Sequence, residues 1–294
     1  MPESAHQPNH PGEVLRGGEF YSPIQARLRT GDVLLSELRQ PGSRSVPRHE
    51  HELAYVTVVL HGEYLEGDRG QLDQLTPFTA VFNPAGIAHS TVIGPAGASF
   101  FTIEFREQAV QQLGLRLPCR TTSDRGAGAM LWPGLRLYSA FKTGAAGSPV
   151  LEENVLEAHV LEVLGAITES ESPSRTMTDT SAPRWFRRVK EHLHEGFREP
   201  LRMRELAREA GVHPVHLARV FRRIERRTPG EYQQRLQVRA ACELLRDLQW
   251  PLAAIAAECG FADQSHFTRV FRRMAGTTPA RFRQAVAPRA SALS

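Results

Sequence analysis

Cysteine is scarce in this sequence of 294 residues, which contains only Cys119, Cys242 and Cys259. The three lie far apart and form no C-x-x-C pair, which excludes a disulfide framework and a paired-thiolate zinc or redox site. We expect all three to be packing residues. No stretch approaches the ~20 consecutive apolar residues of a membrane span, and residues 1–13 lack the basic start and apolar centre of an export signal. We therefore expect a cytoplasmic protein with no membrane partner.

The sequence also lacks the common motifs of catalysis. It has no nucleophile elbow, P-loop, dinucleotide-binding glycine motif or H-E-x-x-H pair. We therefore expect a protein that is not an enzyme, with no catalytic residue and no cofactor. The hydrophobic content of 41% excludes a disordered chain. The length predicts two domains of ~100–200 residues each.

The net charge of +4 hides an uneven distribution along the chain. Residues 1–183 carry 14 basic and 21 acidic residues, whereas residues 184–294 carry 22 basic and 11 acidic residues. The second part therefore has a net charge of +11 and the first a net charge of −7. A basic surplus in one domain is typical of a protein that binds a polyanion, because neutralised phosphates release counterions. The alternative is a basic surface that faces only solvent.

The first part of the chain has the pattern of a β domain. Short apolar and β-branched segments separated by Gly and Pro are typical of an antiparallel barrel or a double-sheet roll. They occupy residues 32–38, 52–60, 62–67, 78–82 and 98–105. We expect turns between them, including one at GPAG, residues 94–97.

Helical patterns follow the β segments at residues 107–115 and 150–168. The second pattern has a broad apolar stripe, formed by Leu156, Val160, Val163 and Ile167 and widened by Leu161 and Leu164. Its width predicts burial, either in the core of its own domain or in a dimer contact. Residues 170–183 are rich in Ser, Thr and Pro, which indicates an interdomain linker.

Residues 184–294 are helical by periodicity and contain an internal repeat. The repeat aligns ELAREAGVHPVHLARVFRRIERRTPGEY, from Glu205, with AIAAECGFADQSHFTRVFRRMAGTTPARF, from Ala254. Each copy has a glycine, Gly211 or Gly260, at a turn that needs a positive φ, followed by a helix with inward apolar residues. This pattern indicates a helix-turn-helix, present twice. Between the copies, residues 231–247 have the spacing of a rigid helix.

Each copy ends in a Thr-Pro pair that predicts the start of a new helix. Thr228 and Thr278 can act as N-caps, each followed by Pro at the first helical position. Glu231 completes a capping box with Thr228.

The tandem helix-turn-helix, with GFADQSHFTRVFRRMAGTTPARFR in the second copy, resembles the DNA-binding domain of the AraC/XylS family of transcription regulators over about residues 184–285. The resemblance implies that the second helix of each copy enters a DNA major groove and that RNA polymerase is a partner. It places base contacts at Val215, His216, Ala218, Arg219, Gln264, Ser265, His266, Thr268 and Arg269. Arg222, Arg223, Arg272 and Arg273 fall at the helix ends, where phosphate contacts are expected. Arg can pair with guanine and Gln with adenine through two hydrogen bonds.

Two residues of the first copy depart from the family pattern. Arg226 takes the place of Gly276 at a helix end that favours a left-handed residue, which costs a non-glycine residue ~1 kcal/mol. His213 takes the place of a Ser-like N-cap, whereas Asp263 can cap the second helix. We therefore expect the first copy to be less stable or less base-specific than the second.

Two short motifs in the first part of the chain resemble those of the cupin barrel. PRHEH, residues 47–51, fits the HxH motif, and PAGIAH, residues 84–89, fits the PxGxxH motif, with Gly62 between them. The resemblance covers about residues 32–105. It implies a barrel with a ligand site in its interior.

The histidines of these motifs are candidate site residues. His49 and His51 share one face of a strand because side chains alternate, and a barrel can aim both, with His89, at one interior point. Three imidazoles suit Zn, Fe, Ni or Cu. However, metal-binding cupins usually add a Glu four or five residues after the second His, and here those positions hold Tyr55 and Val56. We therefore expect an effector pocket that includes the three histidines and no metal; a metal site and structural histidines are the alternatives.

These patterns predict an α+β multidomain protein with a C-terminal all-α tandem helix-turn-helix domain. We expect a cupin-like antiparallel β-barrel sensor at residues 1–106, a helical dimerisation or connector segment at 107–169, a linker at 170–183 and the DNA-binding domain at 184–294. The expected function is a sequence-specific regulator that binds double-stranded promoter DNA under control of a small-molecule effector. A homodimer through residues 150–168 is compatible with this function. The alternatives are a metal-dependent cupin enzyme fused to a DNA-binding module and an effector-free regulator whose barrel only dimerises.

Overall fold

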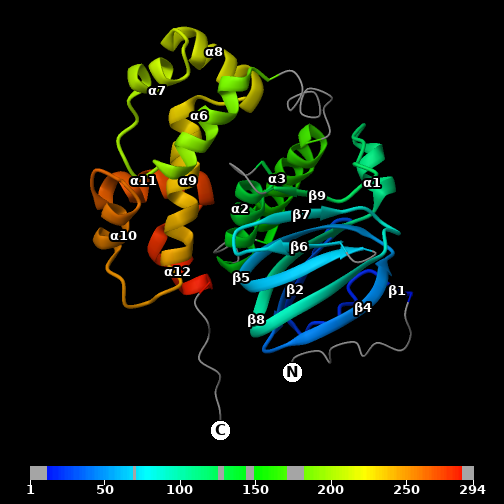
Figure 1. The fold of residues 1–294 in the computed structure, drawn as a ribbon. Coiled ribbons are helices and arrows are strands. Elements are labelled where there is room, and N and C mark those ends of the chain that lie inside the picture. Colours follow the sequence, from blue (N-terminus) through cyan, green and yellow to red (C-terminus); the bar gives the residue numbers. More distant parts are fainter. Residues whose placement is uncertain (1–11, 69–70, 125–128, 144–148, 171–181, 287–294) are drawn as a thin grey trace. The chain divides into compact units, whose positions relative to one another are not determined.

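The chain divides into two compact units, Met1–Ser170 and Glu171–Ser294 (Figure 1). The computed structural model describes residues 12–68, 71–124, 129–143, 149–170 and 182–286. The linker expected at 170–183 lies mostly outside these described residues, and the finer division at residues 106 and 107 stays a prediction. Within the described ranges, every helix is too short or too polar to cross a membrane.

The described residues of the N-terminal unit form nine strands in one sheet. They are β1 (Glu13–Leu15), β2 (Ile24–Thr30), β3 (Val33–Gln40), β4 (Arg44–His51), β5 (Ala54–Asp68), β6 (Gln71–Leu75), β7 (Ala80–Asn83), β8 (His89–Phe105) and β9 (Thr122–Asp124). Their hydrogen-bonded order is β1-β4-β8-β5-β7-β9, with β3 also paired to β8, β2 to β3 and β6 to β5. Only β1 and β4 are parallel among these pairs. The predicted sheet-rich N-terminal domain is therefore confirmed, but the pairing of the described strands does not close into a barrel.

Two long strands replace shorter ones that the sequence predicts. β5 runs through Gly62, and β8 runs through residues 94–97, where we expected a turn. Gly62 and Gly97 both have positive φ, and a Cβ on Gly62 would lie 2.0 Å from the Gly97 carbonyl oxygen. The two strands therefore bend together at glycines that permit a close backbone approach, instead of ending there.

Three helices complete the described part of the N-terminal unit: α1 (Glu107–Gln112), α2 (Leu131–Thr143) and α3 (Pro149–Ser170). α3 packs against α2 and β2, and α2 also contacts β5. The predicted stripe of α3 is buried, except Leu161, which is 51% exposed and was wrongly assigned to it. The sequence analysis missed α2 because Pro133 and Gly134 are helix breakers, although Pro is tolerated in a first turn. Gly134 is needed there, since a Cβ on it would lie 2.7 Å from the Val58 side chain.

The described part of the C-terminal unit is entirely helical. Its helices are α6 (Arg184–Glu195), α7 (Met203–Glu209), α8 (Pro214–Glu225), α9 (Pro229–Leu244), α10 (Leu252–Glu258), α11 (Gln264–Ala275) and α12 (Pro279–Val286). α7 and α8 form the first helix-turn-helix, α10 and α11 the second, and α9 is the predicted helix between them. Cys242 and Cys259 are buried here, as predicted, whereas Cys119 of the other unit is exposed and is not a packing residue.

α9 ties the two helix-turn-helix units together. It contacts α6, α8, α10 and α11. Its buried Gln237 donates hydrogen bonds to the carbonyl oxygens of Phe197 (3.0 Å) and Gly260 (3.3 Å). Buried Gln233 donates to those of Phe197 (2.9 Å) and Glu199 (2.6 Å). The loop before the first unit and the turn of the second are therefore both held by α9.

The turns of the two units differ in how tightly they are packed. Gly211 and Gly260 have positive φ, 68° and 78°, as the sequence predicts. A Cβ on Gly260 would lie 2.1 Å from the carbonyl oxygen of Arg198, whereas a Cβ on Gly211 would have no neighbour within 4 Å. The second turn therefore needs glycine for space as well as for conformation.

This difference predicts unequal effects of two alanine substitutions. Gly211→Ala should lower the free energy of unfolding by roughly 1–2 kcal/mol, the strain of a left-handed residue with a Cβ. Gly260→Ala should lower it by a further ~1–3 kcal/mol because the methyl group overpacks the Arg198 carbonyl. Both losses of free energy are measured by urea unfolding of the full chain. The transition that reports on the C-terminal unit gives the values. Equal losses would contradict the close approach at Gly260.

Candidate functional site

An N-cap residue stands at the start of the second helix of each helix-turn-helix unit. The Asp263 carboxylate accepts a hydrogen bond from the His266 backbone N–H (2.7 Å) at the start of α11, as predicted. His213 performs this role for α8, where its Nδ1 accepts from the Val215 N–H at 3.3 Å. An imidazole therefore serves as the N-cap that the family pattern assigns to a Ser-like residue.

The conformations at the C-terminal ends of these helices also agree with the predictions from the sequence. Arg226 and Gly276 both adopt the left-handed conformation, with φ of 59° and 71°. Thr228 and Glu231 form the predicted capping box at the start of α9. The first unit thus carries the strain of a non-glycine residue that the second avoids.

The predicted base-contact residues lie on the first two turns of α8 and α11, away from the buried face. Val215 (68% exposed), His216, Arg219, Gln264, Ser265 and Arg269 are exposed, and Ala218, His266 and Thr268 are partly buried. The opposite faces are buried and consist of Leu217, Val220, Phe221, Phe267, Val270 and Phe271. Each helix therefore packs through one face and presents polar or small side chains on the other.

The predicted phosphate-contact arginines are exposed in the last turns of α8 and α11. They are Arg222, Arg223, Arg272 and Arg273. An open depression on α11 brings Arg272 and Arg273 together with Gln264, Ser265, Thr268, Arg269 and Thr278. Arg273 also donates to the Gln234 side chain on α9 at 2.7 Å, which orients its guanidinium group. Thr278 was predicted only as an N-cap, and its position in this depression was not predicted.

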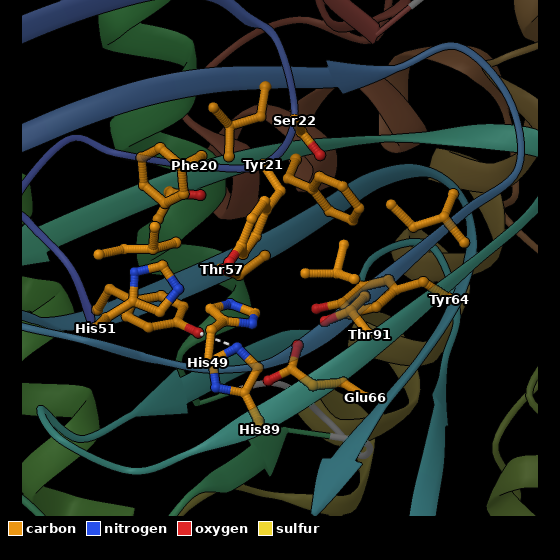
Figure 2. Close-up of a pocket in the computed structure, with 17 residues that line it drawn as sticks. Phe20, Tyr21, Ser22, His49, His51, Thr57, Tyr64, Glu66, His89 and Thr91 are labelled. Atoms are coloured by element: carbon orange, nitrogen blue, oxygen red, sulfur yellow. Dashed lines mark hydrogen bonds between the residues drawn. The ribbon is translucent and has the colours of Figure 1, made fainter. Parts of the chain in front are cut away.

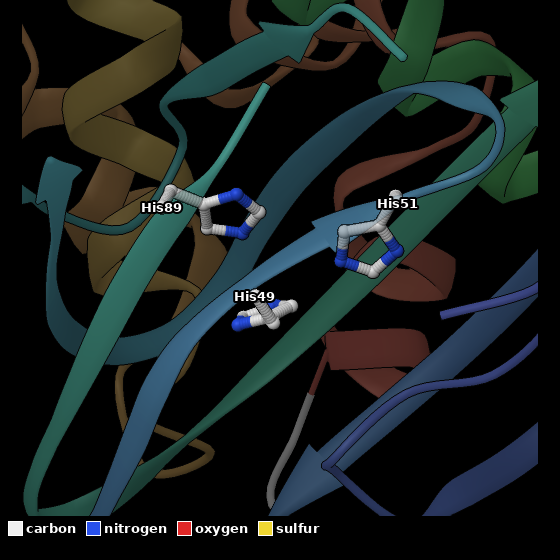
Figure 3. A group of neighbouring side chains, drawn as sticks. All are labelled: His49, His51 and His89. Atoms are coloured by element: carbon white, nitrogen blue, oxygen red, sulfur yellow. The ribbon is translucent and has the colours of Figure 1, made fainter. Parts of the chain in front are cut away.

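The three histidines of the cupin-like motifs come together in the N-terminal unit. His49 and His51 share one face of β4, and His89 of β8 is the strand-register partner of His49. One nitrogen of each ring lies within 4.8 Å of the others, and the residues are only 3%, 5% and 7% exposed. Figure 3 shows the three rings facing one another. The structure thus groups these residues as predicted, although their role stays a proposal.

Hydrogen bonds determine which ring nitrogens carry a lone pair. The Nδ1–H groups of His49 and His89 donate to the carbonyl oxygens of Pro47 (2.8 Å) and Ile87 (3.3 Å). Because a carbonyl only accepts, Nε2 carries the lone pair in the neutral form of each of these two rings. The hydroxyl of Tyr55 donates to His89 Nε2 at 3.1 Å.

The environment favours the neutral form of His49 and His51. Burial, with the neighbouring charge of His89, lowers the pKa of His49 to about 4. Burial, together with the charges of His89 and His49, lowers the pKa of His51 well below its usual value. Neutral imidazole is the form that binds metals. Three buried imidazoles with neighbouring nitrogens fit a transition-metal ion.

A small cavity adjoins the histidines (Figure 2). Its volume is about 80 Å³, compared with the ~300–1,000 Å³ of typical small-molecule pockets. Tyr55, Thr57 and Glu66 of β5 line it beside the three rings. Glu66 is buried and accepts a hydrogen bond from the Asn83 amide at 2.7 Å. Glu66 was not predicted as a site residue. Strand alternation places it on the same face as Tyr64 but does not show that the histidines of other strands lie close to it.

The low pKa of His49 predicts that the N-terminal unit loses stability in acid. The unfolded chain binds a proton at His49 below a pH of ~6.5, whereas the folded chain does so only near pH 4. Stability therefore rises with pH between these values and falls by about 2 kcal/mol per such histidine from pH 7 to pH 5. Thermal unfolding of wild type and His49→Gln at both pH values measures this effect. A pH dependence identical in the two proteins would contradict it.

Comparisons with known proteins point to the same part of the chain as the tandem repeat. Residues 206–285 match the family model described as a helix-turn-helix domain. The HTH-type transcriptional regulator Rv1931c of Mycobacterium tuberculosis is 40% identical over 60 residues, which span 20% of this chain and 23% of that protein. The matched segment therefore covers about a quarter of that relative.

Two solved structures extend the comparison. An apo ToxT variant from Vibrio cholerae is 12% identical with a TM-score of 0.38, covering 89% of this chain and 100% of that one. A probable AraC family transcriptional regulator from Rhodopseudomonas palustris is 27% identical with a TM-score of 0.34, covering 36% of this chain and 100% of that one. The family match and the tandem motifs described above agree that residues 206–285 form a helix-turn-helix domain.

Proposed function

We propose that this protein is a transcription regulator that binds double-stranded promoter DNA with its C-terminal unit and an effector with its N-terminal unit. The observation that carries the proposal is the pair of exposed second helices, α8 and α11, in a part of the chain with a net charge of +11. Neutralising DNA phosphates releases counterions, so this charge supports binding to any duplex. Sequence preference has to come from the exposed side chains of the two helices.

The two helices offer different base-reading chemistry. α11 presents Gln264 and Arg269, which can pair with adenine and guanine through two hydrogen bonds each, and Ser265, His266 and Thr268 beside them. α8 presents Arg219 and His216, with Val215 and Ala218 suited to thymine methyl groups. We therefore assign the sharper base preference to α11.

The arginines in the last turns of both helices complete the proposed interface. Arg222, Arg223, Arg272 and Arg273 lie in the last turns of α8 and α11, and we assign them to phosphate contacts. Phosphate contacts position the protein without reading sequence, so their loss should weaken binding to all duplexes alike.

The N-terminal unit is the proposed sensor. Its cupin-like motifs place His49, His51 and His89 around one cavity, which we assign as the effector site. A homodimer through residues 150–168 is part of the proposal, and its contact has to use side chains such as Val155 and Leu161, because the main stripe of α3 is buried in its own unit. RNA polymerase is the further partner that regulation of transcription in the cytoplasm implies.

The proposed division between base and phosphate contacts predicts distinct effects for two arginines of α11. Arg269→Ala should lose ~1–3 kcal/mol of binding on the preferred duplex and relax the selection of one or two bases. Arg272→Ala should weaken all duplexes about equally and reduce the slope of log affinity against log salt by about one phosphate contact. Selection from randomised duplexes and salt titrations with wild type and both variants test this.

Arg269 and Arg272 are a matched pair, because both are exposed on α11 and lie three residues apart. A difference between the two variants therefore reports on the kind of DNA contact that each arginine makes. An unchanged selected motif in Arg269→Ala would contradict its role as a base contact. A wild-type affinity that does not respond to salt would contradict nucleic-acid binding altogether.

A further inference from the structure

We propose that the cavity beside Glu66 binds a small organic ammonium ion and that this ion is the effector of the regulator. The inference rests on the proposed function, because it names the chemical class of the effector for the N-terminal unit. Three features of the cavity wall point to this class: its charge, its unpartnered polar atoms and its aromatic rings.

The charge of the cavity wall is negative. Among the described residues that line the cavity, Glu66 is the only one with a carboxyl group, and none is a Lys or Arg. Glu66 is buried and forms no ion pair with a residue that the structure describes. A buried carboxylate without an opposite charge is unfavourable, because burial removes its hydration. A positively charged occupant balances this charge, whereas an anion is repelled by it.

The histidines of the cavity do not supply the missing positive charge. Burial lowers the pKa of His49 to about 4 and that of His51 well below its usual value, so both are neutral at neutral pH. His89 uses both of its ring nitrogens in hydrogen bonds to groups other than Glu66. The positive partner of Glu66 therefore has to come from outside the cavity wall.

Hydrogen bonds hold the Glu66 carboxyl group in place. The Asn83 amide donates to its Oε1 at 2.7 Å, and the Thr121 hydroxyl donates to Oδ1 of the same amide at 2.9 Å. A carboxylate has about four acceptor sites, so Glu66 keeps the capacity to accept from a ligand. An ammonium group has only N–H donors and matches this acceptor.

Two buried polar atoms of the cavity wall point independently to a ligand. Nδ1 of His51 and the hydroxyl oxygen of Thr102 have no hydrogen-bond partner among the described residues. The two residues are 5% and 1% exposed, and both line the cavity. Buried polar atoms in folded proteins nearly always have a partner. Each of these atoms can accept a hydrogen bond, so either can bind an N–H group of the ion.

Aromatic rings form much of the remaining cavity wall (Figure 2). They belong to Phe20, Tyr21, Tyr55, Tyr64 and Phe100. Faces of aromatic rings attract organic cations, and aromatic cages are a common site for ammonium ligands. Phe20, Tyr64 and Phe100 also belong to one buried apolar cluster, which suits a hydrocarbon group. The occupant is therefore an ammonium ion that carries carbon.

The volume of the cavity limits the size of this ion. It is about 80 Å³, the space of roughly three waters in the liquid. An ammonium ion with a few carbon atoms fits, whereas a drug-sized ligand needs ~300 Å³ or more.

Binding is tested by calorimetry on the full chain, with a chelator present to keep transition metals off the histidines. The probes are the chloride salts of methylammonium, ethylammonium, propylammonium and tetramethylammonium, with 1-propanol and sodium propionate as comparison compounds. 1-Propanol has the size of propylammonium without its charge, and propionate has the opposite charge. We expect saturable binding of an ammonium ion, one per chain, about 10-fold or more tighter than binding of either comparison compound. This comparison uses the wild type alone, so it does not depend on how a variant folds.

Glu66→Gln tests the source of the selectivity. The substitution keeps an oxygen that can accept from Asn83 but removes the negative charge. Affinity for the ammonium ion should fall about 10-fold or more. Glu63→Gln makes the same change at an exposed residue of β5 and should bind as wild type does. The absence of saturable ammonium binding, equal binding of 1-propanol, or unchanged ammonium affinity in Glu66→Gln would overturn the site.

DNA binding distinguishes the ammonium site from the proposed function. Duplexes selected from a random pool are titrated with the protein in the ammonium chloride that binds best and in sodium chloride of equal ionic strength, because DNA affinity depends on salt. A several-fold difference between the two salts in wild type and Glu63→Gln, absent in Glu66→Gln, supports the ion as the effector. Saturable ammonium binding without such a difference would overturn that role. Failure of the protein to select any duplex in either salt would instead overturn the proposed function.

Discussion

The packing of α9 is the constraint on which the C-terminal unit depends. Two buried glutamines on this helix, Gln233 and Gln237, donate to backbone carbonyl oxygens of the loop before the first helix-turn-helix unit. Gln237 also donates to Gly260, in the turn of the second unit. A buried amide that loses its partners is destabilising, so neither segment can move away from α9 without cost. α8 and α11 are therefore held at one spacing.

Local rules made most of the C-terminal unit predictable from sequence. Thr228, Asp263 and the positive-φ glycines act through hydrogen bonds and backbone angles within a few residues, so their effects can be read from short segments. His213 is an exception to these local rules. Its imidazole caps α8 at 3.3 Å, although the usual capping preferences do not include His.

The N-terminal unit was less predictable because its strands depend on contacts across the sheet. Gly62 and Gly97 have the sequence pattern of turns, but their close approach lets β5 and β8 continue. The shared face of His49 and His51 follows from strand alternation alone. The hydrogen bond from Tyr55 to His89 and the small volume of the cavity do not, since they depend on strand order and register.

We propose that one chain places α8 and α11 at a fixed spacing on DNA. α9 has 16 residues, about 24 Å at 1.5 Å per residue, a length compatible with helices in successive major grooves about 34 Å apart. The direct measurement compares the affinity of the monomeric full chain for two duplexes. One is its selected duplex, in which α8 and α11 each protect one short segment of DNA, called a box. The other is the same duplex with 5 base pairs inserted between the two boxes. We predict protected boxes about one helical turn apart and a loss of at least 10-fold on insertion, because half a turn moves one box to the opposite face. Unchanged affinity after the insertion would contradict the account.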